Sequence, residues 1–292
     1  TGGLGFIGSH TTVALQQAGH EVIIIDNLSN ASIEVKDRIA KITGKAPIFE
    51  QIDLREKDKV QDFFLRYPNI DGVIHFAASK AVGESVEKPL LYYENNIASL
   101  IYLLQELQKR KNTAFIFSSS CTVYGQADKL PVTEDAPFKQ AECPYGNTKQ
   151  INEEIIRDTC AIAKNIKAIS LRYFNPIGAH ASALIGELPN GVPQNLIPYI
   201  TQTAIGLRES LSVYGDDYPT SDGTCIRDYI HVVDLAEAHL AALEYILQGK
   251  IQDNYEVFNV GTGKGSSVLE VIKAFEKVTG QALPYKIVGR RA

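Results

Sequence analysis

Short apolar runs alternate with longer amphipathic stretches through the first 172 residues of the chain. The run at 21–26 is typical, because four β-branched residues stand together, as in strands that are covered on both faces. Runs of this kind predict strands at 21–26, 46–52, 72–77, 114–118 and 168–172. The stretches between them have apolar residues at helical spacing and predict helices at 9–18, 35–42, 58–66, 90–109 and 145–164.

This alternation predicts the fold class. A helix between two buried strands forms a right-handed crossover, which makes the strands parallel and covers both faces of the sheet. We therefore expect an α/β fold with a doubly wound parallel sheet at 1–175. After residue 176 the chain becomes rich in Gly, Pro, Asn and Ser, which predicts a smaller lobe at 176–292, with part of 224–262 packing back on the first domain. Helices are predicted in this second part at 195–207, 234–248 and 267–280.

Three glycines, Gly2, Gly5 and Gly8, precede the first predicted helix. Glycines at this spacing allow a tight turn and a close approach of the backbone to a pyrophosphate, which the helix N-terminus then attracts. Asp26 ends the next strand, 18 residues after Gly8, where a carboxylate accepts hydrogen bonds from ribose hydroxyls and repels a 2′-phosphate. The pattern predicts a Rossmann domain that binds NAD in preference to NADP. For the loop taken alone, a plain glycine-rich turn is the alternative.

Composition excludes several other classes of protein. Apolar residues make up 45% and charged residues 22% of the chain, as in globular proteins, and the net charge of -5 offers no basic surface to nucleic acid. The sequence has no apolar stretch of membrane-spanning length. The four cysteines lack the spacing of a zinc site or a disulfide framework, which favours the cytoplasm, and the six histidines predict no metal site.

A serine-rich strand end and a Tyr–Lys pair carry the candidate chemistry. Three serines at 118–120 follow a predicted strand, at the edge of a parallel sheet where ligands bind. Tyr145 and Lys149 lie one above the other on the predicted helix. A phenol is a poor base at neutral pH, but a cation beneath it favours the phenolate, and a serine can share the proton. We predict that Ser120, Tyr145 and Lys149 form one proton-transfer unit; a surface Tyr–Lys pair is the alternative.

Several segments carry longer motifs. They are TGGLGFIGSH at 1–10, DNLSN at 26–30, HFAASKAVGESV at 75–86, SSSCTVYG at 118–125, YGNTK at 145–149, RYFNPIGAH at 172–180 and DYPTSDGTCIRDYIHVVDLA at 217–236. Together they resemble the extended short-chain dehydrogenase/reductase family, and within it the UDP-hexose 4-epimerases, over the whole chain. The resemblance implies an NAD-dependent isomerase that interconverts UDP-galactose and UDP-glucose, and a cytoplasmic homodimer.

The resemblance also implies roles for individual residues. Tyr145 would take the proton of the sugar 4-hydroxyl while hydride passes from C4 to NAD, with help from Ser120 and Lys149; the 4-keto sugar would then turn over and take the hydride back. NAD contacts are implied for Gly2, Gly5, Phe6, Ile7, Gly8, Asp26, Asn27, Leu28, Ser29, Asn30, Ala31, Asp53, Leu54, Phe76, Ala77, Ala78, Ser79, Lys80, Asn95, Ser120, Tyr145, Lys149 and Phe174. UDP-sugar contacts are implied for Ser120, Tyr145, Asn175, Asn195, Leu196, Val213, Tyr214, Arg227 and Arg291.

Other readings stay open. The aromatic residues of the NAD set would also suit a core, Lys80 a solvated surface, Asn195 a helix cap and Arg291 a frayed end. A nucleotide-sugar 4,6-dehydratase shares the loop and the Tyr–Lys pair but carries Asp and Glu where this chain has Cys121 and Thr122. A related NAD-dependent nucleotide-sugar epimerase is a further alternative, and so is an NAD-binding sensor without catalysis.

From both ends of the chain we expect the sequence given to be part of a longer one. A phosphate-binding loop follows a buried strand, yet the sequence begins at Thr1 without a Met. The other end stops after an apolar segment, at Ala292. We expect the first strand of the sheet and a C-terminal segment to lie outside the sequence given.

Overall fold

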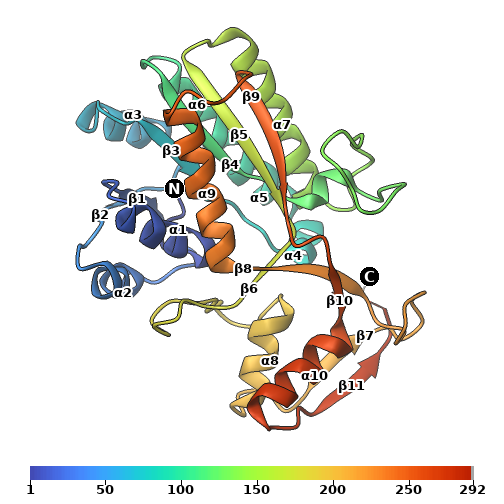
Figure 1. Cartoon of the computed structure of the whole chain (residues 1–292). Helices are drawn as coiled ribbons and strands as arrows, with labels where there is room; N and C mark the ends of the chain where they lie inside the picture. The colour runs from blue at the N-terminus through green and yellow to red at the C-terminus, as the bar shows by residue number, and fades with distance from the viewer. Residues whose placement is uncertain (291–292) are drawn as a thin grey trace.

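The parallel strands lie in two hydrogen-bonded groups in the computed structural model, which describes residues 1–290 (Figure 1). The larger sheet has the order β3-β4-β5-β9, and all its strands are parallel. The smaller pairs β1 with β2, also in parallel. The strands are β1 (Ile23–Asp26), β2 (Ile48–Gln51), β3 (Gly72–His75), β4 (Thr113–Ser118), β5 (Ile166–Tyr173) and β9 (Tyr255–Val260).

Thr1 and Gly2 lie between the two groups. The Thr1 amino group donates to the Ile74 carbonyl at 2.8 Å, and the Phe76 N–H donates to the Thr1 carbonyl at 3.1 Å. On the other side, the Gly2 N–H donates to the Ile25 carbonyl at 2.7 Å. The ends of β1 and β3 therefore meet at the first residues of the glycine loop.

Helices cover both faces of the larger sheet, as the doubly wound prediction requires. Successive side chains of β4 point to opposite faces: Phe115 and Phe117 pack in one buried cluster, and Ile116 packs in another. The first cluster also contains side chains of α3 (Lys57–Arg66), α6 (Ser99–Leu107) and α7 (Pro144–Ile162). The second contains side chains of α1 (Phe6–Gln17) and α9 (Val232–Leu247). The fold class is confirmed, and α2 (Glu34–Thr43) packs beside α1.

The helix predicted at 90–109 differs from a regular α-helix. It consists of α5 (Pro89–Tyr93), a π-helical turn η1 (Glu94–Ala98) and α6, and a short α4 (Val82–Glu87) precedes it. A π-turn adds a residue to the helical turn and shifts the side chains that follow. Asn96 in this turn is buried and reaches the loop after β3, where the Ser79 N–H donates to its side-chain oxygen at 2.8 Å.

A second group of elements lies beyond the end of β5 (Figure 1). Two sheets belong to it, one with the order β10-β8-β6 and one pairing β7 with β11. Ile200, Ile272 and Leu283 form part of its core. Its elements are β6 (Asn175–Ile177), α8 (Leu196–Ala204), β7 (Leu211–Tyr214), β8 (Ile226–His231), β10 (Gly265–Ser267), α10 (Val268–Thr279) and β11 (Tyr285–Val288).

The sequence did not predict these short strands, nor β9. They are three to six residues long and mostly half-exposed, so they show no continuous apolar run. Pairing with neighbours far along the chain makes them strands: β9 pairs with β5, and Phe258 lies opposite Leu171. Strand β9 is therefore part of the larger sheet, and α9 packs against that sheet.

Helix α7 offers a test of how far the large core supports the fold. Ile156 is fully buried, whereas Ile162 on the same helix is 84% exposed. Ile156→Ala should lower the free energy of unfolding by about 2–5 kcal/mol, since it leaves a cavity. Ile162→Ala makes the same chemical change on the surface and should cost less than about 1 kcal/mol. Chemical denaturation measures both; equal losses would show that α7 does not depend on this packing.

Candidate active site

The carboxyl ends of the parallel strands bring the predicted NAD residues to one edge of the sheet. Each segment follows a strand or opens the first helix. Residues 2–8 form the glycine loop and the start of α1, 26–31 follow β1, 53–54 follow β2, 76–80 follow β3, Ser120 follows β4 and Phe174 follows β5. Asn95 lies in the π-turn, and Tyr145 and Lys149 lie on α7.

The glycine loop packs so closely that side chains would not fit. Gly2 has φ +67°, and a Cβ on it would lie 2.7 Å from the Ala77 nitrogen. A Cβ on Gly8 would lie 2.2 Å from the Gly2 carbonyl oxygen. Gly5 is the N-cap of α1, and among the described residues no side chain caps that helix. The first N–H groups of α1 are therefore available to an anion.

Asp26 ties the glycine loop to the end of β1. Its carboxylate accepts hydrogen bonds from the Leu4 N–H at 3.2 Å and from the Leu28 N–H at 2.9 Å. The neighbouring Asp53 lies at the end of β2 and accepts from Asn27 at 3.2 Å and from the Arg55 guanidinium at 2.7 Å. The Arg55 hydrogen bond is the main cause that lowers the pKa of Asp53 to about 2. Asp53 is thus an anion at neutral pH, held within the segment that follows β2.

Ser120, Tyr145 and Lys149 are 7%, 8% and 3% exposed. Pro144 opens α7 at its first position, so Tyr145 and Lys149 fall on its first two turns. The Lys149 ammonium donates to the Ser118 carbonyl oxygen at 2.7 Å and lies 5.8 Å from the centre of the Tyr145 ring. The end of β4 and the start of α7 are therefore joined by a buried charge.

Burial governs the protonation of this group. It raises the pKa of Tyr145, and the Tyr173 phenol adds to this, while the hydrogen bond with Ser120 acts in the opposite direction. Burial also lowers the pKa of Lys149 to about 8, against the charge of Glu153, which raises it. Burial is the largest effect on Tyr145 in the protein alone, so its phenol is protonated there. The Lys149 ammonium donates to the Ser118 carbonyl, and the expectation that this cation favours the Tyr145 phenolate stays a prediction.

Apart from Ser120 and Tyr145, the described residues that were predicted for the sugar nucleotide lie on the second group of elements. Asn175 begins β6 and donates to the Asp228 carbonyl at 3.0 Å. Asn195 is the N-cap of α8, and Leu196 begins that helix. Tyr214 ends β7, and Arg227 lies on β8, where it donates to the Ile226 carbonyl at 2.8 Å. Val213 is buried in a core cluster, which leaves only its backbone for a ligand, and Arg291 lies outside the described residues.

Two of the predicted residues meet at a residue that the sequence did not single out. Glu187 accepts a hydrogen bond from Asn195 at 2.5 Å and pairs with the Lys80 ammonium at 3.2 Å. Its side chain is 10% exposed, and it lies in the loop between β6 and α8. Lys80 follows β3, so this carboxylate joins the predicted cofactor side to the predicted substrate side. No local pattern marks Glu187, because its partners are distant in the sequence.

Glu153 and Arg172 are two further residues of the site that the sequence did not single out. They form a buried ion pair at 2.6 Å beneath the serine segment. Glu153 could have been found from the sequence, since it follows Lys149 by one helical turn. Arg172 begins the motif at 172–180, but the sequence alone predicts no function for it.

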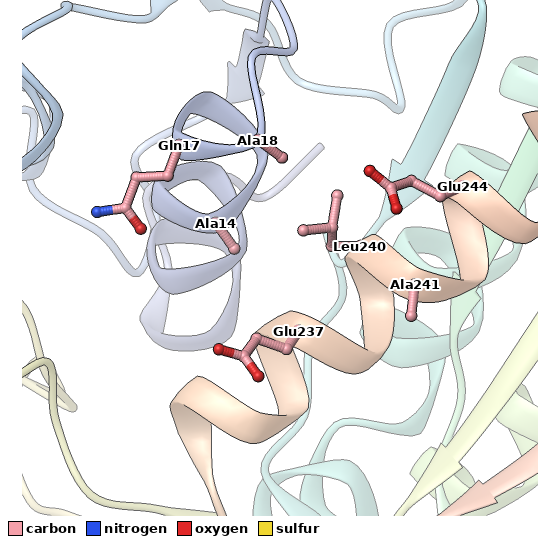
Figure 2. Close-up of a pocket in the computed structure, with 7 residues that line it drawn as sticks. All are labelled: Ala14, Gln17, Ala18, Glu237, Leu240, Ala241 and Glu244. Atoms are coloured by element: carbon pink, nitrogen blue, oxygen red, sulfur yellow. The ribbon is translucent and has the colours of Figure 1, made fainter.

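A separate hollow of about 390 Å³ lies between α1 and α9 (Figure 2). It is lined by small or apolar residues, one glutamine and two carboxylates: Ala14, Gln17, Ala18, Glu237, Leu240, Ala241 and Glu244. None of the predicted site residues lies among them, so the hollow is not part of the site built here. Within the described residues, no helix has the length and apolar character to cross a membrane.

Solved structures with the same fold hold dinucleotides and sugar nucleotides. The UDP-glucose 4-epimerase of Bifidobacterium longum in complex with NAD+ and UDP is similar with a TM-score of 0.94 and 47% identity, covering 99% of this chain and 85% of that one. The enzyme of Stenotrophomonas maltophila with bound NAD and formylated UDP-arabinopyranose is similar with a TM-score of 0.93 and 49% identity, again covering 99% and 85% of the two chains.

Sequence comparison also finds UDP-glucose 4-epimerases. The UDP-glucose 4-epimerases of Bacillus subtilis and Erwinia amylovora are 51% and 50% identical to this chain, covering all of it and 84% and 85% of their own lengths. The model of the NAD dependent epimerase/dehydratase family matches residues 1–261. With this match and the buried Ser–Tyr–Lys group at the sheet edge, the chain belongs to the NAD dependent epimerase/dehydratase family.

Proposed function

We propose that this chain is an NAD-dependent isomerase that inverts C4 of a UDP-hexose and interconverts UDP-galactose and UDP-glucose. The observation that carries the proposal is the buried group of Ser120, Tyr145 and Lys149 at the carboxyl edge of the sheet. Relatives about half identical over the full chain are UDP-glucose 4-epimerases. Similar solved structures contain NAD with UDP or a UDP-sugar.

The glycine loop fits NAD. Side chains on Gly2 or Gly8 would fill the cradle, and the N-terminus of α1 has N–H groups free for a pyrophosphate. Asp26 lies beside this loop, where its carboxylate suits ribose hydroxyls. The segments that follow β1, β2, β3 and β5 would hold the rest of the cofactor. When bound, NAD supplies the acceptor and donor of a hydride, so the sugar is oxidised and reduced within one cycle.

The chain's own residues move the proton. Once Tyr145 has lost its own proton, its phenolate would accept the proton of the 4-hydroxyl and return it after the 4-keto sugar has turned over, so no net oxidation results. Ser120 is hydrogen-bonded to Tyr145 and shares the proton. Lys149 supplies positive charge from the next helical turn, and its link to Ser118 keeps α7 in register with β4. A dry site strengthens each of these electrostatic effects.

Cys121 argues against a 4,6-dehydratase. Such an enzyme needs an acid and a base at the positions of Cys121 and Thr122, and neither residue has a carboxyl group. Burial raises the pKa of the Cys121 thiol to about 11, so the thiol stays protonated and cannot serve as the base. Epimerisation needs only the proton-transfer group that is present.

For the substrate, we infer that Asn175, Asn195, Leu196, the Val213 backbone, Tyr214 and Arg227 contact the UDP-sugar. An aromatic ring such as Tyr214 can stack on uracil, and a guanidinium such as Arg227 can bind a pyrophosphate through two hydrogen bonds. Arg291 stays a prediction.

We infer further that the protein is a cytoplasmic homodimer. Val82, Val86 and Leu90, on α4 and α5, are 49%, 62% and 81% exposed, which suits a surface covered by a second copy. All four cysteines are free, in keeping with a reducing compartment.

One assay separates the candidate functions. The protein is mixed with UDP-galactose without added cofactor, and the products are resolved by chromatography. We expect UDP-glucose, because a cofactor reoxidised in each cycle has no need to leave. A 4-keto-6-deoxy product would assign a dehydratase, and the absence of any turnover by NAD-loaded protein would assign a sensor.

Tyr145→Phe should lower kcat by at least about 100-fold, the scale of losing a general base, while the purified protein still contains NAD. Tyr102→Phe makes the same chemical change on α6, outside the predicted site, and is the matched control. Steady-state kinetics and the absorbance of released NAD measure the two effects. Normal turnover by Tyr145→Phe would exclude Tyr145 from proton transfer.

Gly8→Ala should weaken NAD binding at least about tenfold, equivalent to about 1.4 kcal/mol, because the new methyl group would meet the Gly2 carbonyl at 2.2 Å. Gly83 on α4 has no atom within 4 Å of its Cβ position, so Gly83→Ala should leave binding unchanged. Calorimetric titration of NAD into stripped protein compares them. Equal affinities would mean that the loop does not hold the cofactor.

A further inference from the structure

Glu153 is a buried carboxylate that the mechanism above does not use. Its side chain is 3% exposed. It accepts hydrogen bonds from the Ser119 hydroxyl at 2.5 Å, from the Arg172 guanidinium at 2.6 to 3.2 Å and from the Tyr255 hydroxyl at 3.3 Å. A charge this deeply buried is costly unless it is paired and hydrogen-bonded, and here both conditions are met.

Its partners come from the segments that carry the candidate chemistry. Ser119 directly precedes Ser120, whose hydroxyl accepts from the Thr122 N–H at 3.2 Å. Arg172 is the second-last residue of β5 and lies two residues before Phe174. Glu153 itself lies on α7, one turn beyond Lys149. The carboxylate therefore joins the ends of β4 and β5 to the helix of the proton-transfer group.

We propose that Glu153 is a positioning residue: it holds the Ser119–Ser120 turn against α7 and keeps a negative charge beside the Lys149 ammonium. This inference rests on the proposed function. It assigns Glu153 no contact with substrate or cofactor. The positional part acts through Ser119, and the electrostatic part acts through Lys149, so the two can be tested separately.

The electrostatic part follows from the surroundings of Lys149. Burial disfavours its charge, and the charge of Glu153 opposes this effect, so that the pKa of Lys149 lies at about 8. Arg172 offsets part of the Glu153 charge. Three other titratable side chains lie around Lys149: His75, Tyr145 and Tyr173. They are neutral at pH 7, since burial moves the pKa of each toward the uncharged form. Without Glu153, Lys149 should lose its proton at lower pH.

Four variants test both parts. Glu153→Gln removes the charge and keeps the size, whereas Glu153→Asp keeps the charge and shortens the side chain. Ser119→Ala removes one hydrogen bond and leaves Glu153 charged. The matched control is Glu106→Gln on α6, which neutralises another buried carboxylate, 7% exposed and paired with Lys109 at 2.5 Å, outside the site.

The measurements are kcat/KM for UDP-galactose across the pH range, thermal melting, and NMR of protein labelled with 15N-lysine. The Lys149 signal is assigned by its loss in Lys149→Arg. We expect Glu153→Gln to move the Lys149 titration and the basic limb of kcat/KM down by about one pH unit, a tenfold change in acidity. Glu153→Asp should leave both near the wild-type position. Ser119→Ala should lower kcat severalfold without moving the limb.

Glu106→Gln should lower the melting temperature and leave the profile unchanged. An unmoved Lys149 titration in Glu153→Gln would overturn the electrostatic part, and wild-type kcat in Ser119→Ala would overturn the positional part. If Glu153→Gln does not fold, Glu153→Gln/Arg172→Gln removes both buried charges. It should move the Lys149 titration in the same direction but by less, because the loss of the Arg172 charge partly cancels the loss of the Glu153 charge. Absence of turnover in the wild type would instead overturn the proposed function, and the NMR titration would still decide whether Glu153 controls Lys149.

Discussion

The hydrogen bond from the Lys149 ammonium to the Ser118 carbonyl is the interaction on which the site depends. A buried cation must find acceptors, and the last carbonyl of β4 is the one in reach of the second turn of α7. The bond fixes the position of α7 relative to the end of β4 and so places Tyr145 beside Ser120. The Asn96 side chain reinforces this position, because it donates to Thr148 at 3.0 Å and accepts from the loop after β3. Displacing α7 would therefore disturb both the cofactor loop and the proton-transfer group.

The same burial that makes this bond strong also sets the chemistry. It raises the pKa of Tyr145 and lowers that of Lys149, so both groups resist the charged form. A tyrosine in such a place is a protonated phenol until its surroundings change.

Glu187 joins the two halves of the candidate site, since it pairs with Lys80 from the loop after β3 and accepts a hydrogen bond from Asn195 at the start of α8. A ligand that spans the halves would compete for both partners of this carboxylate. This order reduces the conformational entropy that would be lost on binding, because the polar groups are already held in place before a ligand arrives.

Local patterns in the sequence were sufficient for most helices and for the central strands around 114–118 and 168–172, because buried parallel strands are continuous apolar runs. The Gly2 to Gly8 spacing, Asp26 and the Tyr145–Lys149 interval likewise led to the proposed site without a structure. Tertiary structure alone decided the short strands β6 to β11, since pairing with distant partners rather than composition makes them strands. It alone decided the protonation of Tyr145 and the positions of Glu153 and Glu187, because burial and ion pairing depend on residues brought together from different elements, which no local spacing contains.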